Sequence, residues 1–593
     1  MARDRARRRI AIAALVVLSL AAAALASGLH LGRLLDARGA ASAWGVLSGF
    51  ASPDLGADFL ARIARLSLES LFIGVLGTAL AAVIGVSLAL VAARVPDLPD
   101  PPGGGSVVRL AGGGLRFCVR FLLGVLRAIP DIVWAFLFVR LFGLGPGPAV
   151  LAIAVSTGGV IGKLFAELAE AVDPGPVHAL RRAGAGRLGV LLYGVLPQVQ
   201  RQFVAYALFR LECSIRSASI LGVVGAGGLG SEIALSVRYF EYDKLATALI
   251  AVLAFVIALE AVSARLRRMR IRWALVFAAI GSIAALAYLD IPWSELWRSG
   301  AVAARMSIGS AGDAIGVALD ALPRALETVA MAWCATIAAA AVAFLFAPLV
   351  SRPLIVGSYL PDPPRPRGLA RAARWSVFAV ARSGFQVGRA MPELTLALLF
   401  VMWVGPGATA GALAIAFHTV GVLGRLYGDI YEEVERGPAA ALESTGASRL
   451  GVWAHGVLPQ VFPRILAFTL YRFEVNVRMT AIVGFVGAGG IGTALHTAIS
   501  LFHVADLVIL LAVILFLVTA LDWIGDRARH RILTARFGAR SASRRRRPTR
   551  LTSYRVEEID HGGDHAHEDT HANRRRDPGE RDTVVRLLGA GED

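Results

Sequence analysis

Two apolar stretches of this sequence carry the same Arg-x-Glu-x-x-x-Arg arrangement. Charged side chains inside an apolar segment are costly, and they therefore mark candidate functional sites. In each stretch a Glu precedes an Arg by four residues, so the two share one helical face and can pair. Such a pair either neutralises itself and keeps the helix insertable into a membrane, or presents a guanidinium fork to an oxyanion. The residues are Arg210, Glu212 and Arg216, then Arg472, Glu474 and Arg478.

A second repeated pair surrounds a proline inside another apolar stretch. In each copy an acidic residue follows an arginine by four positions, and we expect the two to pair within one helix. The proline between them should kink that helix, either as a structural bend or as a hinge. The residues are Arg127, Pro130 and Asp131, then Arg389, Pro392 and Glu393.

Other polar residues show no spacing typical of catalysis or of metal binding. Cys213 has no histidine near it in the sequence, and His418 and His455 stand alone in apolar stretches. Cys118, Cys213 and Cys334 form no CxxC motif, so we expect neither a disulfide framework nor a cysteine metal site. Lys163 and Arg425 occupy equivalent positions in the two copies. Each is either an anchor whose charged end reaches the membrane surface or a ligand of the substrate.

The elements that position these residues are membrane spans, as the composition indicates. The 593 residues are 56% hydrophobic and 18% charged, with a mean hydropathy of +0.63. Soluble domains are nearer about 45–50% apolar and about 25% charged. A net charge of +18 on so apolar a chain indicates positive residues gathered at one membrane face. Nucleic-acid binding leaves the apolar content unexplained, so we expect contact with membrane lipid and none with nucleic acid.

Twelve segments are apolar enough to cross a bilayer, which takes about 20 residues. The first follows a basic run, and it is either a span or a signal peptide. If the N-terminus is cytoplasmic, the inward-facing loops hold far more Lys and Arg than the outward-facing ones, which places both termini in the cytoplasm. The expected spans are 10–29, 66–93, 118–142, 149–171, 197–222, 244–263, 272–290, 326–350, 376–403, 408–430, 459–484 and 504–524.

The chain repeats itself at an offset of 262 residues. Between 209–230 and 471–492, 11 of 22 positions are identical, which chance does not produce at one fixed offset. Near Glu69 and Glu327 the offset changes to 258. Each copy holds six expected spans, so the two halves share one topology. We therefore expect a pseudo-twofold axis along the membrane normal, with a central path between the halves.

Each copy also contains a glycine run that satisfies GxGxxG. No βαβ unit surrounds either run, so we favour tight turns that shape the outer mouth over a phosphate cradle. The sequence has no GxxxxGK[ST] motif. We therefore expect no cofactor bound by this chain, and any use of ATP belongs to partner subunits. The candidate gate and turn glycines are Gly225, Gly227, Gly228, Gly487, Gly489 and Gly490.

A long inner loop separates the fourth and fifth spans of each copy, at 173–197 and 435–459. Each loop is short-helix-like and amphipathic, and a glycine in it is followed 13 residues later by a proline. Such a segment is either an ordinary interfacial helix or a helix on which a partner docks. Its repetition at the same spacing puts the docking interpretation on an equal footing with the interfacial one.

These motifs, in this order, resemble the permease of phosphonate ABC importers, which have the type I fold with an "EAA" loop. The resemblance covers about 66–263 and 324–525. It implies an all-α integral membrane protein of the bacterial inner membrane, with two permease copies fused in one chain. It also implies that substrate comes from an extracytoplasmic phosphonate-binding protein and that two cytoplasmic ABC ATPase subunits dock on the loops. The matching motifs are Glu69-Ser-Leu and Glu327-Thr-Val, Arg-Ala-Ile/Met-Pro, Gly-Ala-x-Arg-Leu-Gly-Val, Gly-Val-Leu-Pro-Gln, Arg-x-Glu-x-x-x-Arg and Gly-Ala-Gly-Gly.

Two departures from the family pattern make the halves unequal. The Glu that opens the "EAA" loop is His178 in the first copy and Ala440 in the second. Asn476 stands where the first copy has Ser214, so the substrate path need not be symmetric. The docking-loop candidates are His178, Gly184, Pro197, Ala440, Glu443, Gly446 and Pro459. The substrate-path candidates are Arg210, Glu212, Arg216, Arg472, Glu474, Asn476 and Arg478.

The expected organisation has five segments and leaves other transport functions open. One alternative is an ABC permease for phosphate, phosphite or another small solute. A second is an ion-coupled secondary transporter, which needs no docking helix, and a membrane enzyme needs a catalytic set. The segments are an N-terminal span with an outer segment at 1–65, a permease domain at 66–263, a linking span with an outer segment at 264–323, a second permease domain at 324–525, and a disordered basic, His-rich cytoplasmic tail at 526–593.

Overall fold

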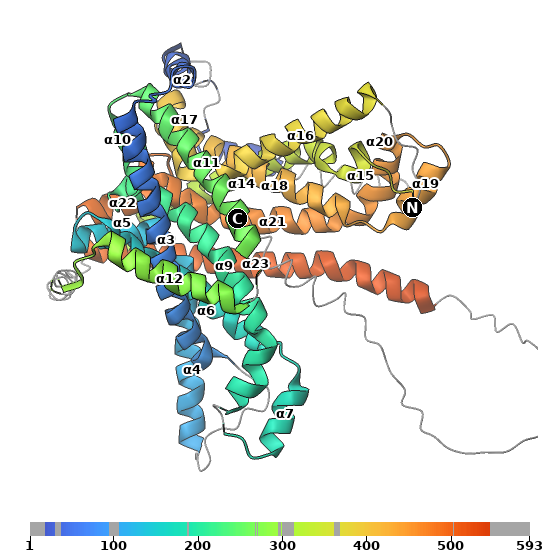
Figure 1. Ribbon diagram of the computed structural model, residues 1–593, viewed down its shortest axis with the longest axis horizontal. Helices are drawn as coiled ribbons and strands as arrows, with labels where there is room; N and C mark the ends of the chain where they lie inside the picture. The colour runs from blue at the N-terminus through green and yellow to red at the C-terminus, as the bar shows by residue number, and fades with distance from the viewer. Residues whose placement is uncertain are drawn as a thin grey trace, which may run out of the picture.

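A computed structural model places the chain as a bundle of helices (Figure 1). All regular secondary structure in the described part of the chain is helical. The all-α fold predicted from the sequence is confirmed. The structure describes residues 18–29, 32, 37–93, 106–186, 189–266, 269, 271–294, 298, 314–360, 368–501 and 503–545.

Corresponding helices follow one another in the same order in the two halves. The first half comprises α2 (Ala37–Gly49), α3 (Ala57–Ala92), α4 (Ser106–Ala128), α5 (Asp131–Phe142), α6 (Pro146–Glu170), α7 (Pro174–Arg182), η2 (Val190–Val195), α9 (Leu196–Leu221), η3 (Gly222–Val224), α10 (Leu229–Arg238) and α11 (Tyr242–Leu266). The second half comprises α12 (Ile271–Leu289), α14 (Ala314–Phe346), η4 (Ala347–Val350), α15 (Arg352–Ile355), α16 (Leu369–Ala390), α17 (Glu393–Val404), α18 (Ala408–Glu432), α19 (Arg436–Ser444), α20 (Arg449–Gly451), η5 (Val452–Val457), α21 (Leu458–Val483), η6 (Gly484–Val486), α22 (Ile491–Ser500) and α23 (Val504–Arg545).

Eight helices of the described chain are long and apolar enough to span a membrane, and three bent pairs raise the number to 11. These elements cover every predicted span except 10–29, of which residues 10–17 lie outside the described residues. Residues 526–545 were predicted to be part of a disordered tail, but they continue α23 without a break. Good helix formers such as Leu, Ala and Arg fill this segment, which explains the extension. The predicted His-rich part of the tail lies outside the described residues.

The predicted proline kinks are complete breaks of the helix. The axes of α4 and α5 meet at 89°, and those of α16 and α17 at 90°. Pro130 and Pro392 stand at the N-caps of α5 and α17. A proline has no N–H to bond the preceding turn, and it keeps the residue before it out of the helical region. Each broken span therefore ends one helix and starts another inside the bundle.

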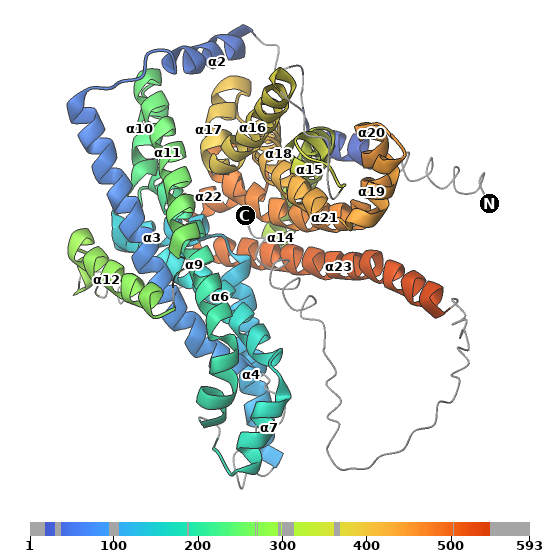
Figure 2. The ribbon, with the colours of Figure 1, turned by 45° about the vertical axis from the view of Figure 1, so that its right-hand side comes forward.

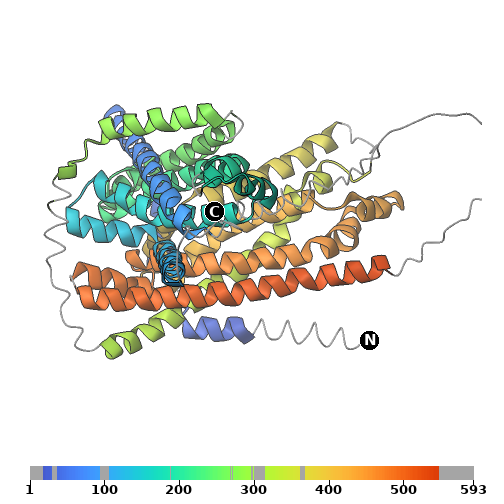
Figure 3. The same ribbon diagram turned by 90° about the horizontal axis from the view of Figure 1, so that it is seen from below.

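Figures 1 and 2 show the helices from α2 to α11 in blue to green and those from α14 to α23 in yellow-green to red, while the green helix α12 lies beside α3. Helix α22 packs against both α5 and α23. Seen from below, α23 runs along the second half and passes beside α4 (Figure 3). The two halves thus touch through their broken helices and last helices.

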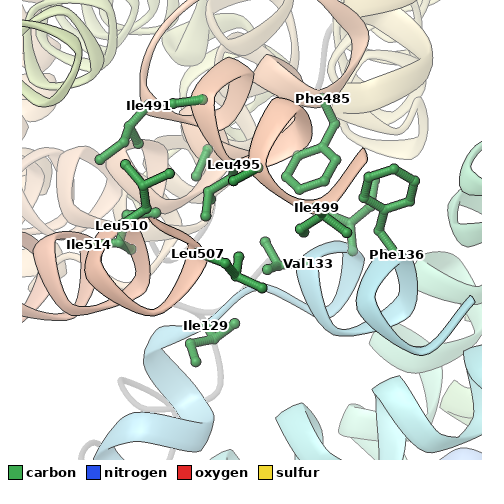
Figure 4. Packing of buried hydrophobic residues seen from close by; sticks show 14 of the residues in the cluster. Ile129, Val133, Phe136, Phe485, Ile491, Leu495, Ile499, Leu507, Leu510 and Ile514 are labelled. Atoms are coloured by element: carbon green, nitrogen blue, oxygen red, sulfur yellow. The ribbon is translucent and has the colours of Figure 1, made fainter. Parts of the chain in front are cut away.

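Apolar clusters join each break to the opposite half in the same way. In the first cluster, Ile129 and Val133 pack with Leu495 and Leu507 of α22 and α23 (Figure 4). Phe136 of the same break meets Phe485 edge to face, with ring centroids 5.6 Å apart. A second cluster uses the equivalent surfaces, joining Ala390 and Met391 of the second half to Leu229, Ile233 and Leu245 of the first. This reciprocity is the pseudo-twofold relation predicted from the repeat.

Candidate functional site

Each helix break sets an arginine and an acid on facing helix ends. Arg127 and Arg389 lie in the last turns of α4 and α16, and Asp131 and Glu393 begin α5 and α17. The C-terminal end of a helix favours a cation and the N-terminal end an anion. Local dipoles therefore stabilise this arrangement at both breaks.

The arginines at the breaks pair across the two halves. Arg127 Nη2 donates to Asp522 of α23, with 3.1 Å between nitrogen and oxygen. Arg389 donates to Glu260 of α11. Glu260 and Asp522 are themselves equivalent at the 262-residue offset, so the two pairs are reciprocal. The predicted intrahelical pairs with Asp131 and Glu393 are wrong, because the breaks turn these acids away from the arginine four residues earlier.

Arg216 belongs to a buried charged network at the second of these contacts, around Glu260. It forms ion pairs with Glu212 at 3.9 Å and with Glu260 at 3.8 Å. Glu260 also accepts hydrogen bonds from Gln386 and Arg389 of the second half. Glu212 is only 5% exposed and Arg216 only 7%, so both charges are held away from solvent. The predicted i,i+4 pair exists here, but it is one part of a network that spans the halves.

The corresponding residues of the second half are arranged differently. Glu474 pairs with Arg529 of α23, and no hydrogen bond or ion pair joins Arg478 to another described residue. The predicted Glu474–Arg478 pair is therefore wrong, because Arg529 lies close enough to take the carboxylate. Arg478 is half-buried, whereas its counterpart Arg216 is buried. The two halves present chemically unequal arginines.

A histidine, a glutamate and an arginine meet in the second half alone. His418 Nε2 lies 3.1 Å from Glu393, and Arg472 lies 3.8 Å from the same carboxylate. The His418 ring is further fixed by a 3.0 Å contact between Nδ1 and the Met391 carbonyl. His418 and Arg472 are almost completely buried. The interpretation of His418 as isolated is wrong, since the fold brings α17 and α21 to it.

Asn476 and Arg210 make polar contacts between neighbouring helices. Asn476 donates to Thr336 at 2.8 Å and accepts from Thr419 at 3.1 Å, and it is fully buried. In the first half, the Arg210 guanidinium lies 3.4 Å from Thr157. The amide of Asn476 thus ties α14, α18 and α21 together in the second half.

The two glycine runs form tight turns held by the first long helix of each half. Gly225 and Gly487 cap the short helices η3 and η6 in the left-handed region. The turns continue through glycines that also have positive φ: Gly227, Gly228, Gly489 and Gly490. A Cβ on Gly490 would lie 2.7 Å from the Thr328 hydroxyl. The backbone N–H of Ile491 donates to that hydroxyl at 2.8 Å.

The first half repeats this contact, because the backbone N–H of Leu229 donates to Ser70 at 2.9 Å. Ser70 and Thr328 follow Glu69 and Glu327 in the repeated motif. The hydroxyl of that motif therefore anchors the glycine turn. Positive φ angles and the close approach of neighbouring side chains explain the glycines, so the tight turns expected from the sequence are present.

The two inner loops contain the expected short helices, α7 and α19. Gly184 and Gly446 follow them with φ of +81° and +80°, and each glycine has open space around it. Only glycine adopts this conformation without strain, and it commonly ends a helix in this way. Pro197 and Pro459 lie at the starts of α9 and α21, where the chain passes directly from the π-helical turns η2 and η5 into α-helix.

The glutamine of each Leu-Pro-Gln motif connects this loop to its membrane helix. Gln198 donates to the carbonyls of Gly194 and Asp173, and Gln460 donates to that of Glu435 and of Gly456 in the equivalent way. His178 and Ala440, which depart from the family pattern, lie partly exposed on α7 and α19.

Glu443 connects α19 to the segment that follows α15. Its carboxylate accepts from the backbone N–H of Tyr359 at 2.8 Å. Burial raises the pKa of the Tyr359 phenol, which therefore stays protonated. The phenol contacts the Tyr431 carbonyl at 3.4 Å. The predicted docking residue Glu443 thus has a structural contact of its own.

The family model described as "binding-protein-dependent transport system inner membrane component" matches residues 103–273 and 368–534. The chain belongs to this family. Each matched segment contains a broken helix, one of the short loop helices α7 and α19, and one Arg-x-Glu-x-x-x-Arg stretch. This inner membrane component is therefore a multi-pass membrane protein that carries the family domain twice.

Several named permeases are similar to this inner membrane component. It is 34% identical over 492 residues to the phosphate-import permease protein PhnE of Mycolicibacterium smegmatis, covering 79% of this chain and 86% of that one. It is 40% identical over 202 residues to the phosphite transport system permease protein PtxC of Stutzerimonas stutzeri, covering 34% and 68%. PhnE2 of Escherichia coli, assigned to a cryptic phosphonate transport system, is 40% identical over 119 residues, covering 20% and 98%.

Sequence reasoning about this inner membrane component missed Glu260 and Asp522. Both lie near the ends of predicted spans, where an acidic residue does not stand out as a charge buried in the membrane. Their equivalence at the repeat offset was the available signal. Their contacts were not foreseeable, because each acid reaches an arginine of the opposite half.

Proposed function

We propose that this chain is the permease of an ATP-driven importer for phosphonates or related phosphorus oxyanions. The observation that carries the proposal is the gathering of repeated arginines at broken helices between the two halves. Sites for anions in transporters are commonly built at repeat interfaces from discontinuous helices. The named phosphate and phosphite permeases, which are similar over long segments, support the same class of substrate.

Arg216 and Arg478 are the proposed contacts of the oxyanion in the path. Both lie at the same position of α9 and α21, and guanidinium groups bind phosphorus oxyanions through paired hydrogen bonds. Arg210 and Arg472 contribute positive charge one turn or more away on the same helices. Glu212 keeps Arg216 in position, whereas Glu474 and Asn476 hold helix α21 against its neighbours through the contacts described above.

The proposed partners face the two sides of the membrane. An extracytoplasmic phosphonate-binding protein delivers the substrate at the glycine turns. Two cytoplasmic ABC ATPase subunits dock on α7 and α19 and use ATP, while this chain binds no cofactor and catalyses no reaction. Both termini lie in the cytoplasm, in keeping with the distribution of Lys and Arg.

Reconstitution tests the proposal. The purified chain is combined in proteoliposomes with its cognate ATPase and binding protein, and ATP hydrolysis is measured with methylphosphonate, phosphite, phosphate or sulfate. We expect stimulation by at least one phosphorus oxyanion and none by sulfate. Uptake driven by an ion gradient without ATPase subunits would instead establish a secondary transporter.

A further inference from the structure

Two acidic residues outside the predicted site join the halves at equivalent positions. Glu260 lies on α11 and Asp522 on α23, 262 residues apart. Their side chains are 19% and 20% exposed, and those of their arginine partners 20% and 21%. The matching positions and similar burial indicate that the same acid–arginine contact is made twice, once by each half.

Each of these acids binds the broken helix of the opposite half. Asp522 of the second half pairs with Arg127 at 3.1 Å, and Glu260 of the first half pairs with Arg389. A relative movement of the halves must therefore stretch or break both pairs. Pairs within a single half, such as Glu241 with Lys244 at 2.9 Å, are not affected by this movement.

Glu260 also contacts the arginine proposed to meet the substrate. Arg216 lies 3.8 Å from Glu260, which is beyond hydrogen-bonding distance but close enough for a strong attraction. The same carboxylate accepts from Gln386 and Arg389. A phosphorus oxyanion at Arg216 therefore competes with Glu260 for one guanidinium group.

The reciprocal contact around Asp522 involves fewer ion pairs than the contact around Glu260. Among the described residues Asp522 pairs with a single arginine, Arg127, and the nearby carboxylate of Glu474 is bound to Arg529. Arg478, the counterpart of Arg216, makes no ion pair with the described residues. The contact around Glu260 is consequently the stronger of the two reciprocal contacts.

We propose that Glu260 and Asp522 are positioning residues that hold the two halves together until an oxyanion enters the path and displaces Glu260 from Arg216. This inference rests on the proposed function. The negative charge of the anion at Arg216 also repels the Glu260 carboxylate, and this repulsion weakens its pair with Arg389. Of the two reciprocal pairs, only that of Asp522 with Arg127 then still opposes a rotation of the halves, and the movement reaches the ATPase subunits through α7 and α19.

Hydrolysis of ATP without any ligand tests this proposal. The full chain is reconstituted with its ATPase as wild type, Glu260→Gln, Asp522→Asn and the control Glu241→Gln. We expect Glu260→Gln to raise ligand-free hydrolysis about fivefold or more, Asp522→Asn to raise it less, and the control to match wild type. Glu260→Gln should also reduce the further stimulation given by phosphate or methylphosphonate with the binding protein.

Unchanged ligand-free hydrolysis in Glu260→Gln overturns the proposal. So does a fall of ligand-free and ligand-stimulated hydrolysis together with a lower thermal midpoint, since the pair is then only structural. If Glu260→Gln does not assemble, the ligand-free hydrolysis of Asp522→Asn is compared with wild type instead, and an unchanged rate overturns the proposal. Wild-type protein that no phosphorus oxyanion stimulates refutes the proposed substrate class, whereas the ligand-free comparison still tests whether the carboxylates hold the halves.

Discussion

Gly159 of α6 determines how closely the broken helix can approach. A Cβ at this position would lie 2.6 Å from the Leu126 Cβ and 2.9 Å from the Arg127 backbone nitrogen. Real Cβ atoms do not come so close, so Gly159→Ala must push the last turn of α4 outward. This turn carries the arginine that reaches Asp522 across the halves.

The size of the effect follows from two opposing contributions. Forcing an extra methyl group into a packed interior costs about 1–3 kcal/mol. An alanine within a helix recovers up to about 1 kcal/mol relative to glycine. A methyl group added to Gly124, which lies on α4, would meet no atom within 4 Å, so Gly124→Ala gains stability without a clash. The two variants should differ by about 2 kcal/mol, or about thirtyfold in the folding equilibrium.

Thermal unfolding of the purified variants in detergent gives the comparison, followed by ligand-free hydrolysis with the ATPase. We expect Gly159→Ala to unfold at a lower temperature than wild type and Gly124→Ala at an equal or higher one. Gly159→Ala should also raise ligand-free hydrolysis, because Arg127 is moved from Asp522. If Gly159→Ala is as stable as Gly124→Ala, the close packing inferred at the break is refuted.

Three further substitutions test other parts of the structure. Gly184→Val should lose most association with the ATPase in co-purification while Gly184→Asn keeps it, because asparagine tolerates positive φ and a β-branched side chain does not; equal association of both variants would contradict this. Arg216→Ala combined with Arg478→Ala should lower ligand-stimulated hydrolysis at least about tenfold with normal membrane insertion, and unchanged stimulation would make both arginines structural. Ser448→Ala removes the hydroxyl that accepts from the Gly451 N–H at 3.2 Å, and it should cost about 1 kcal/mol in thermal unfolding; an unchanged unfolding temperature would show that this cap contributes nothing to stability.

The architecture followed from patterns that depend on local sequence. Spans, the repeat at 262 and the docking loops are set by hydropathy and by glycine and proline, which act over a few residues. The helix breaks were predicted as kinks, because Pro130 and Pro392 indicate an interruption but not its angle. Both arms of each break pack on one helix of their own half, α6 or α18, and this three-dimensional packing accompanies the bend of about 90°.

The charged contacts could not be derived from spacing alone. A Glu four residues before an Arg correctly predicted the pair of Glu212 with Arg216. The same spacing failed for Glu474, because Arg529 of α23 competes for it. Which arginine a glutamate binds depends on contacts between helices that are far apart in the sequence. The spacing of residues along one helix carries no information about these contacts.

Fusion of the two halves allows one half to differ from the other. His418 meets Glu393 and Arg472 in the second half, while the equivalent position of the first half is Ser156. A pore built from two identical chains would place any such histidine on both sides. In this chain the equivalent positions of the two halves are encoded separately, so a substitution in one half leaves the other unchanged. The polarity of one half can therefore change while the other half keeps its structure.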